Sequence, residues 1–493
     1  MPPNRSRSEP FRTGGLVACL LALALPAAAA TLNVPADHPT IQSAIDAAGN
    51  GDLVLIAPGV YVESLTLSGK NITLASHFLK TGDSALIGQT IIDGGGQGWV
   101  IRVLSSPLTP TIVGLTLRNA SDGVRGHGKF YILESRVTQT SDGIDYESGS
   151  GGLVHSCVFE RNSDDGIDFD GAVPALVENC TIQDNGDDGI EIRLQPYTGP
   201  MVSVAIRNNT IARNDEDGIQ LIGYNVLTKR TFWIEGNLIL NNRMAGLGMM
   251  CCENTVEDLT GASLPERVGL YDNTFVGNDY GVTGGDSLIA LNNIFVGCAH
   301  TGLKNADATS IATHNLFHGN LENHNFSNVD VATTLYADPL LMPDYKLGSA
   351  SPAIDAGLAT YEANGVLLWS RSPLDYFGTA PDLGAFETNP GLLAVGPNDR
   401  ASGVRLLPPS PSPSRGHTVF RVELPAAGPI RLEVLDVAGR SVRVLADSMV
   451  TPGRHEYSWD GRNAEGHAAP AGVYFARLRF DRGVVSRMIA LVR

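Results

Sequence analysis

Basic residues are scarce in this chain of 493 residues. Only 35 residues are Lys or Arg, against 52 that are Asp or Glu, which gives a formal net charge of −17. Binding to nucleic acid or to an anionic membrane surface requires a basic patch, so neither partner is expected. The deficit is concentrated between residues 121 and 220, where 18 acidic residues stand against seven basic ones. From residue 400 onward the balance reverses, with 14 Arg, no Lys and eight acidic residues.

Long apolar runs are also missing. The longest, residues 16–25, is too short to span a bilayer, and we expect no transmembrane segment. Arg5, Arg7 and Arg12 precede this run, and the small residues 28–30 follow it. This pattern predicts that residues 1–30 are a secretory signal peptide, and that the protein is secreted or held at the outer cell surface.

Cysteines are few and lack the spacing of a metal site. Five of the six follow the predicted signal peptide, and none forms a C-x-x-C pair, so we expect no zinc site. Cys157 and Cys180 occupy equivalent places in adjacent repeats. Adjacent parallel strands lie ~4.8 Å apart, which permits a disulfide and equally permits two stacked buried thiols. The sequence leaves both alternatives open.

A short motif recurs five times between residues 121 and 220. It consists of an acidic residue, a Gly and an aliphatic residue. Its glycines are Gly123, Gly143, Gly166, Gly189 and Gly218. Their separations of 20 to 29 residues define a repeat. A period of this size predicts a solenoid, in which each unit buries its apolar face against its neighbours.

A triplet of residues typical of a β-strand, followed by an Asn, precedes each later copy of this motif. Examples are Cys157-Val158-Phe159 with Asn162, and Asn209-Thr210-Ile211 with Asn214. The pattern predicts one coil of a parallel β-helix, with the Asn side chain stacked at an inward turn and the Gly at a turn with positive φ.

These repeats resemble the right-handed parallel β-helix, or pectin-lyase-like, family of secreted proteins. The resemblance implies an all-β solenoid over residues 31–335. Thr40 is expected to cap a short N-terminal helix that carries Ile41, Ala44 and Ile45 on one face and closes the first coil. Residues 336–390 look like the terminal segment that closes the other end of such proteins.

Residues 391–415 form a Pro/Ser/Gly-rich linker, and residues 416–493 contain six strand-like runs. This composition predicts a small Ig-like β-sandwich. Residues 471–474 and 487–493 resemble the flagellar-hook-capping Ig-like module, FlgD-like, and the sorting domain of type IX secretion cargo. The resemblance implies that this domain is a sorting signal, which the secretion machinery recognises and which cleavage then removes. The linker lacks the Pro-Asn-Pro often found there, which leaves a plain binding domain as the alternative.

The repeat places carboxylates in columns along the solenoid. Val124, Ile144, Ile167, Ile190 and Ile219 should point inward, and the next residue of each coil should point outward. Such a stack of like charges needs an offsetting cation, and Ca²⁺ accepts oxygen ligands of this kind. We therefore expect a Ca²⁺ site among six residues: Asp142, Asp145, Asp165, Asp168, Asp188 and Glu191. The competing interpretation is a solvated acidic face built from ordinary turn residues.

The family resemblance adds an enzymatic possibility. Its polysaccharide lyases use Ca²⁺ to neutralise a uronate while an Arg or Lys abstracts the C5 proton. Arg193 and Lys129 are the candidate bases here, and the candidate substrate-binding residues are Arg125, Lys229 and Arg230. For Arg193 a salt bridge with Asp170 is the favoured alternative. The Asn-Thr-Asp motif of pectin-hydrolysing members is absent.

Two functions follow from these patterns. The first is a secreted β-helix protein that binds an acidic polysaccharide and, as a lyase-like enzyme, cleaves it by Ca²⁺-assisted β-elimination. The second is a non-catalytic adhesion or carbohydrate-binding scaffold at the cell surface. The sequence does not decide between enzyme and scaffold.

Overall fold

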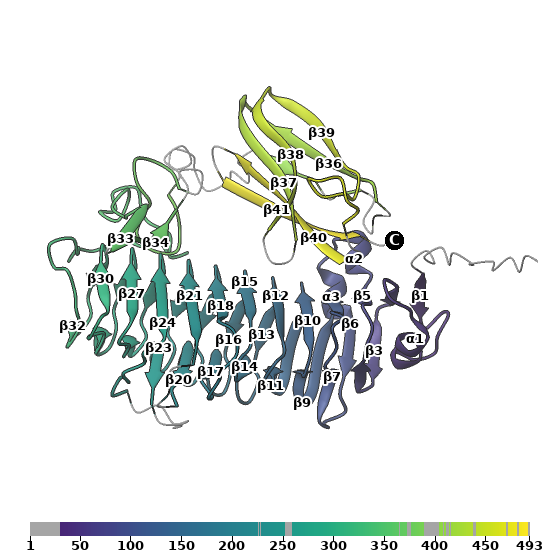
Figure 1. The fold of residues 1–493 in the computed structure, drawn as a ribbon, viewed down its shortest axis with the longest axis horizontal. Coiled ribbons are helices and arrows are strands. Elements are labelled where there is room, and N and C mark those ends of the chain that lie inside the picture. The colour runs from purple at the N-terminus through teal and green to yellow at the C-terminus, as the bar shows by residue number, and fades with distance from the viewer. Residues whose placement is uncertain are drawn as a thin grey trace, which may run out of the picture.

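The computed structural model describes residues 30–491, except 225, 227, 252–258, 364, 372–375, 389–403, 408, 411–413, 415, 437–439, 470–471 and 481–482. It confirms the predicted class, a parallel β-helix followed by a small antiparallel β-domain (Figure 1). The predicted signal peptide and most of the predicted linker lie outside the described residues.

One long parallel sheet, sheet A, runs the length of the solenoid. Its strands are β1 (Thr31–Val34), β2 (Leu53–Ile56), β5 (Thr73–Ser76), β8 (Thr111–Val113), β10 (Lys129–Leu133), β12 (Gly151–His155), β15 (Ala175–Glu178), β18 (Val202–Arg207), β21 (Arg230–Glu235), β24 (Arg267–Tyr271), β27 (Leu288–Leu291) and β30 (Ile311–Thr313).

The other strands of the coils form sheet B, which consists of two parallel rows. The first row holds β3 (Gly59–Val62), β6 (Thr90–Asp93), β13 (Val158–Glu160), β16 (Thr181–Gln183), β19 (Thr210–Ala212), β22 (Leu238–Leu240), β25 (Thr274–Val276), β28 (Ile294–Val296) and β31 (Leu316–His318). The second holds β4 (Leu65–Leu67), β7 (Trp99–Val103), β14 (Ile167–Asp170), β17 (Ile190–Arg193), β20 (Ile219–Ile222), β23 (Ala245–Met250), β26 (Tyr280–Thr283), β29 (Thr301–Lys304) and β32 (Glu322–Asn325). Strands β9 (Thr116–Gly126) and β11 (Arg136–Tyr146) turn the corner and belong to both rows.

The interior of the solenoid is a continuous apolar core. The five aliphatic residues that follow the repeated glycines are fully buried in it, as predicted. Aromatic rings also stack from coil to coil: the rings of Phe275, Phe295 and Phe317 are spaced 4.9 Å apart. Each coil therefore completes its core only against its neighbours, as expected for a solenoid.

Two ladders of buried Asn side chains join the coils, which confirms the predicted stacking. In one ladder the Nδ2 of Asn185 donates to Oδ1 of Asn214 at 2.9 Å, and Asn214 donates in the same way to Asn242. A second ladder runs from Asn209 through Asn237 to Asn315. The residue before each ladder position takes a left-handed conformation, for example Asp184 with φ 57° and Arg213 with φ 56°.

The repeated glycines do not serve the turn that we predicted. Their φ angles lie outside the left-handed region, which the residue before each ladder position occupies instead. The glycines are needed because successive coils approach closely at this point. A Cβ on Gly166 would lie 2.6 Å from the carbonyl oxygen of Gly189, and one on Gly189 would lie 2.5 Å from that of Gly218.

The N-terminal helix is present as predicted. Helix α1 (Ile41–Ala47) begins after Thr40, whose side chain accepts from the backbone N–H of Ser43 in a capping box. Ile41, Ala44 and Ile45 are buried against the first coil. Two short helices, α2 (Phe78–Thr81) and α3 (Ala85–Gln89), interrupt the early coils.

The described residues between 336 and 388 pack along the flank of the later coils. Leu347 and Leu383 lie against Ile294 and Leu316 of the first row of sheet B. The hairpin of β33 (Thr360–Ala363) and β34 (Val366–Ser370) places Trp369 against Tyr271 of sheet A, with ring centroids 4.4 Å apart.

The C-terminal domain consists of two antiparallel sheets around a separate core that includes Phe420 and Trp459. One sheet holds β35 (Arg405–Leu406), β36 (Thr418–Leu424) and β39 (Gly453–Trp459), and the other holds β37 (Gly428–Asp436), β38 (Ser441–Val450), β40 (Gly472–Phe480) and β41 (Gly483–Leu491). This arrangement confirms the predicted Ig-like sandwich.

The structure decides between the two alternatives for Cys157 and Cys180. Cys157 and Cys180 are buried free thiols, so the stacked-thiol alternative is correct. Among the described residues, no helix combines the length and the hydrophobicity that crossing a membrane requires.

Candidate acidic cation site

The predicted columns of acids lie directly over one another. Asp145 pairs with Asp168, Asp168 with Glu191, and Glu191 with Gln220 in the parallel register of β11, β14, β17 and β20. We call this set the strand column. The acids that precede the glycines form the inner column: Asp122, Asp142, Asp165, Asp188 and Asp217. The two columns together are the acidic face.

Burial of the acidic face contradicts the competing interpretation, in which these side chains form a solvated surface. Asp168 is only 7% exposed, Glu191 3% and Asp188 1%. The solvated-face interpretation is therefore wrong for these positions. The physical reason is the close stacking of the coils, which covers each carboxylate from both sides.

Four of the five acids of the inner column each accept one backbone hydrogen bond from the next coil: Asp142, Asp165, Asp188 and Asp217. Asp165 Oδ1 accepts from the N–H of Asp188 at 2.9 Å, and Asp188 Oδ1 accepts from the N–H of Asp217 at 2.7 Å. One oxygen of these carboxylates is thus used in holding the coils together. For Asp188 the second oxygen, Oδ2, is buried without a hydrogen-bond donor.

Several buried oxygens of the acidic face have no hydrogen-bond donor. They include Oδ1 of Asp145, Oδ1 of Asp168 and Oδ2 of Asp188. Such an orphaned buried oxygen is costly unless a proton or a cation satisfies it. Ligand atoms of Asp165, Asp168 and Glu191 lie within 4.8 Å of one another, and Asp145, Asp168 and Asp170 form a second such group.

The carboxyl pKa values are raised throughout the face. Burial, reinforced by neighbouring carboxylates, raises the pKa of Asp142 to about 7 and that of Asp168 to about 9. Burial also raises the pKa of Asp165 and Asp188 well above the usual value. A group of acids that resists ionisation in this way favours a bound cation, because the cation stabilises the ionised form. Six to eight oxygens suit Ca²⁺, and all of these donors are oxygens.

Two arginines border the acidic face, and both are engaged in ion pairs. Arg193 pairs with Glu191 at 2.6 Å and with Asp170 at 3.5 Å, which agrees with the salt bridge that we favoured for it. Burial opposes its charge, yet the carboxylates of Glu191, Asp168 and Asp170 raise its pKa. Arg125 pairs with Asp122 and with Asp145, each at 2.8 Å.

The other predicted basic residues belong to sheet A or its loops. Lys129 is exposed at the start of β10, and Arg230 at the start of β21 is 3% exposed. The Nη1 of Arg230 donates to the backbone oxygen of Gln195, and its guanidinium lies over the ring of Tyr197. Lys229 donates to the backbone oxygen of Thr198 at 3.4 Å. The structure thus places Arg125, Arg193 and four of the predicted metal ligands on strands of sheet B, namely Asp142, Asp145, Asp168 and Glu191. Asp165 and Asp188 lie on the turns that precede β14 and β17, and Lys129, Lys229 and Arg230 belong to sheet A or its loops.

Sequence reasoning missed a third column of acids on the turn beside the inner column. Asp164, Asp187 and Glu216 form it, and Asp187, Asp188 and Glu216 bring ligand atoms within 4.8 Å of one another. Burial and the charge of Glu216 raise the pKa of Asp187 to about 7. The signal was visible as a second acid immediately before the inner-column acid in three consecutive repeats.

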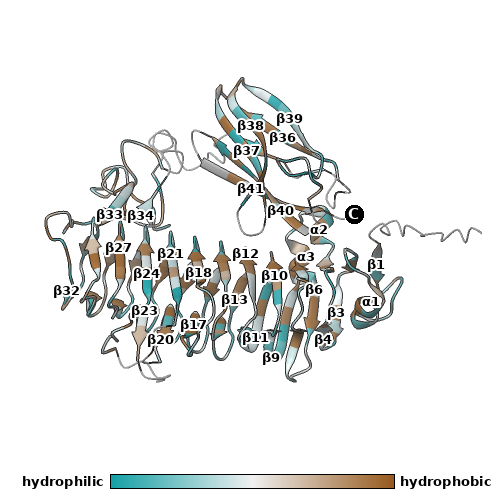
Figure 2. Ribbon diagram, viewed as in Figure 1, coloured by the Kyte–Doolittle hydropathy of each residue, from teal (hydrophilic) through white to brown (hydrophobic). Residues whose placement is uncertain are grey.

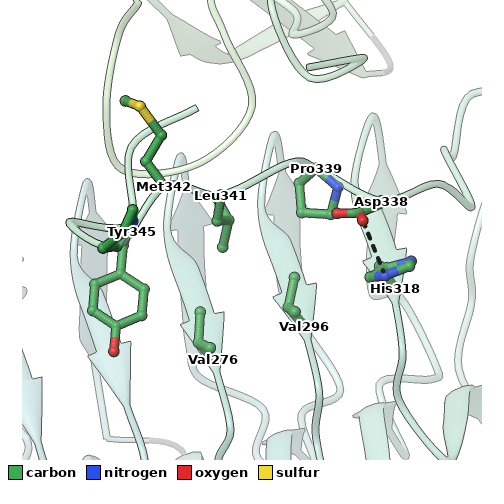
Figure 3. A pocket seen from close by; sticks show the side chains of 9 residues that line it. Val276, Val296, His318, Asp338, Pro339, Leu341, Met342 and Tyr345 are labelled. Atoms are coloured by element: carbon green, nitrogen blue, oxygen red, sulfur yellow. Dashed lines mark ion pairs between the residues drawn. The ribbon is translucent and has the colours of Figure 1, made fainter. Parts of the chain in front are cut away.

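A separate cavity of about 410 Å³ lies where residues 338–345 cross the first row of sheet B (Figure 3). Val276, Val296 and Leu341 line it, and the Nε2 of His318 lies 3.8 Å from a carboxylate oxygen of Asp338. Its apolar lining distinguishes it from the acidic face.

Comparison with known families agrees with both parts of the fold. Residues 101–258 match the family model described as a right-handed β-helix region, and residues 412–480 match the model of the FlgD Ig-like domain. No curated protein matches the sequence.

Several solved structures share the architecture at low sequence identity. Pectate lyase Pel9A is 18% identical, with 70% of this chain and 90% of that one covered and a TM-score of 0.48. The A-module of mannuronan C-5 epimerase AlgE4 from Azotobacter vinelandii is 17% identical, with 58% and 84% covered and a TM-score of 0.35. The tailspike gp49 of Acinetobacter baumannii bacteriophage Fri1, a capsular polysaccharide depolymerase, is 10% identical, with 94% and 78% covered and a TM-score of 0.31. The two family-model matches show that the chain carries a right-handed β-helix region and, after it, a FlgD Ig-like domain.

Proposed function

We propose that the acidic face binds Ca²⁺ and, through the bound ion, an acidic polysaccharide outside the cell. One observation supports the cation above all: buried carboxylates stand in register on three coils with oxygens that have no hydrogen-bond donor. Water cannot solvate these groups, so a hard cation is the partner that best offsets their mutual repulsion.

The proposal of a polysaccharide ligand is based on the partly exposed acids at the edge of the acidic face. Asp170 and Asp187 are only half-buried, so an ion held beside them retains coordination positions toward solvent. Ca²⁺ takes six to eight oxygens and fills such positions with water or with ligand carboxylates. A uronate carboxylate is a ligand of this kind, and without the cation the acidic face would repel it.

Binding is better supported than cleavage. A base for β-elimination must accept a proton at neutral pH, whereas the pKa of Arg193 is raised by its carboxylate neighbours. Arg125 is held by two carboxylates in the same way. In the proposed role both arginines balance part of the negative charge and hold the ligand carboxylates in place.

The cation is tested by the thermal midpoint of the full chain in EGTA and over a Ca²⁺ titration. Extracellular Ca²⁺ sites bind at about 10⁻⁴ to 10⁻³ M, and a concentration of 100 Kd would stabilise the fold by about 2.7 kcal/mol. Asp168→Asn should abolish the rise in midpoint. Asp215→Asn, at an exposed acid of the same region, should retain it. A wild-type midpoint that is independent of Ca²⁺ would refute the site.

The polysaccharide is tested separately with immobilised pectate, alginate and a neutral glucan. Retention of wild type on an acidic glycan in Ca²⁺, and its loss in EGTA or in Asp168→Asn, is the expected result. Absorbance at about 235 nm during the incubation reports β-elimination, because elimination creates an unsaturated uronate. Ca²⁺ binding without retention on any acidic glycan would leave the scaffold function, with Ca²⁺ in a structural role.

A further inference from the structure

The outer side of sheet A is apolar in two separate patches. Side chains there alternate with those of the core, so Leu133 and Leu153 point outward while their neighbours Ile132 and Val154 point inward. The first patch spans the early coils and includes Leu53, Leu55, Val113, Leu133 and Leu153. The second lies on the later coils and includes Tyr271, Ile289 and Leu291.

Between the two patches the same column is charged. The outward positions that continue from Leu133 are His155, Glu178, Arg207 and Glu235, in direct register from strand to strand. Arg207 and Glu235 pair across neighbouring coils at 3.3 Å. This column is therefore polar between the patches, whereas the neighbouring outward column stays apolar through Leu176, Ala205 and Trp233.

Each apolar patch has its own cover. Trp369 of the β33–β34 hairpin stacks on Tyr271 over the second patch. The first patch is covered by Val473, Phe475 and Met488 of the C-terminal domain, together with Phe78 and Leu79 of helix α2. Figure 1 shows β40 and β41 lying against this end of the solenoid, and Figure 2 shows hydrophobic colour on β10 and β12 beneath them.

The contacting strands of the C-terminal domain are suited to this position. In β40, Tyr474, Ala476 and Leu478 enter the core of the domain, whereas Val473 and Phe475 point to the opposite side. The ring of Phe475 lies 4.8 Å from that of His155. The domain thus has an apolar outer surface where the solenoid has one.

We propose that the first apolar patch is a built docking surface for the chain's own Ig-like domain, which is a fixed part of the molecule. The argument rests on the apolar side chains that meet in the contact, where Val473, Phe475 and Met488 of the domain pack against the patch that includes Leu133 and Leu153. An apolar strip on a solvated sheet face would otherwise be an aggregation hazard. Ionisable groups at the margin are consistent with the contact: burial raises the pKa of Glu134, and the nearby His155 and Arg487 of β41 oppose that shift.

Docking affects how a receptor gains access to the predicted sorting signal in the C-terminal domain. Val473, Phe475 and Met488 face the solenoid, so a receptor that needs this surface can bind only after the domain has been released. The contact lies on sheet A, whereas the acidic face belongs to sheet B, so docking leaves the acids uncovered. This inference is independent of the proposed Ca²⁺ site.

The test uses the full chain and small-angle X-ray scattering together with calorimetry. Phe475→Glu places a charge in the contact but outside the core of the Ig-like domain. In this variant we expect a larger radius of gyration than in wild type. We also expect two thermal transitions, where wild type should show one. Met449→Glu, at an exposed position of the same domain, should match wild type in both measurements.

A second variant distinguishes release of the Ig-like domain from misfolding of that domain. Leu153→Glu alters the solenoid side and leaves the sequence of the Ig-like domain intact, so it should give the same increase in radius and the same two transitions. Docking is refuted if wild-type scattering requires a freely moving domain. It is also refuted if Leu153→Glu, with native circular dichroism, leaves both the radius and the transition unchanged.

Discussion

Four carboxylates of the inner column lose hydration and each gain one backbone hydrogen bond from the next coil: Asp142, Asp165, Asp188 and Asp217. For Asp188 that bond engages only Oδ1, and Oδ2 is buried without a donor. The free energy of a buried ionised group is unfavourable under these conditions, which is why the pKa values are raised. The charge state of single residues therefore links pH, Ca²⁺ and stability in this protein.

Without Ca²⁺, stability should fall as pH rises from about 6 to about 9. The folded state holds protons on Asp142, with a pKa of about 7, and on Asp168, with a pKa of about 9, whereas the unfolded chain has already released them near its ordinary value of 3.8. The folded state thus binds more protons, and deprotonation destabilises it. The measurement is the urea midpoint in EGTA at several pH values.

Asp168→Asn provides the comparison for this pH series. It should flatten the dependence because one titrating group is removed, while Asp215→Asn should follow wild type. Saturating Ca²⁺ should reverse the trend, since ligand carboxylates must be ionised to bind the ion. Stability that rises with pH in EGTA across this window would contradict the assignment of raised pKa values.

At the scale of the repeated coil, two features determine how the coils stack. They are the Asn ladders and the repeated glycines, which lie over one another on successive coils. The ladder through Asn278 is interrupted at the next coil, where Cys298 stands in place of Asn. The backbone N–H of Cys298 still donates to Oδ1 of Asn320 at 2.9 Å, so the backbone retains ladder geometry there.

Cys298→Asn should therefore stabilise the solenoid by about 1 kcal/mol. The new carboxamide would accept from Asn278, just as Oδ1 of Asn278 accepts from the N–H of Asn242 at 2.9 Å. Cys298→Ser, which is polar but too short to continue the ladder, should not stabilise it. Chemical denaturation of the three proteins decides the matter, and a destabilised Asn variant would show that the site cannot accommodate the larger side chain.

Gly189→Ala should destabilise the solenoid by about 2–4 kcal/mol. Its Cβ would lie 2.5 Å from the carbonyl oxygen of Gly218 and 2.7 Å from Nδ2 of Asn214, so the coils would have to separate. Gly88→Ala is the matched control, because Gly88 lies in helix α3 with no atom within 4 Å of the added Cβ. There the substitution should be neutral or slightly stabilising, through the higher helix propensity of Ala. Equal midpoints for the two variants would argue against close coil approach.

At the scale of the whole molecule, function and assembly occupy different sheets. Sheet B carries the acidic face, and the outer side of sheet A carries the Ig-like domain. The net charge is segregated in the same sense, with the acids in the central coils and an excess of Arg in the C-terminal domain. Binding of a cation and docking of the domain can then be varied independently.

Hydrogen exchange should show this separation. Adding Ca²⁺ to the EGTA-treated protein should slow exchange in β11, β14, β17 and β20, because the ion joins coils that otherwise repel one another. Exchange in β36 and β37 of the Ig-like domain should not change. Asp168→Asn should lose the Ca²⁺-dependent protection in the solenoid, and protection spread evenly over both domains would contradict a local site.

The repeat itself was sufficient to predict the solenoid, the inward aliphatic residues, the Asn ladders and the direct stacking of the acids. Those features depend on period and alternation, which are properties of the chain. The sequence by itself could not predict that the acids would be buried, because burial depends on how closely neighbouring coils pack. It also misassigned the glycines to a left-handed turn, since close contact between coils 23 residues apart leaves no local mark that differs from turn chemistry.

Other features were decided only by the tertiary structure. Lys129, Lys229 and Arg230 were near the acids in sequence, yet folding places them on sheet A or its loops, because one coil distributes neighbouring residues over different faces. The ion pair between Arg125 and Asp145 also joins two coils, and the contact between Phe475 and His155 joins two domains that are distant in the chain. The sequence determined which residues repeat, and three-dimensional packing determined which of them meet, because periodicity fixes spacing along a strand but not what covers its faces.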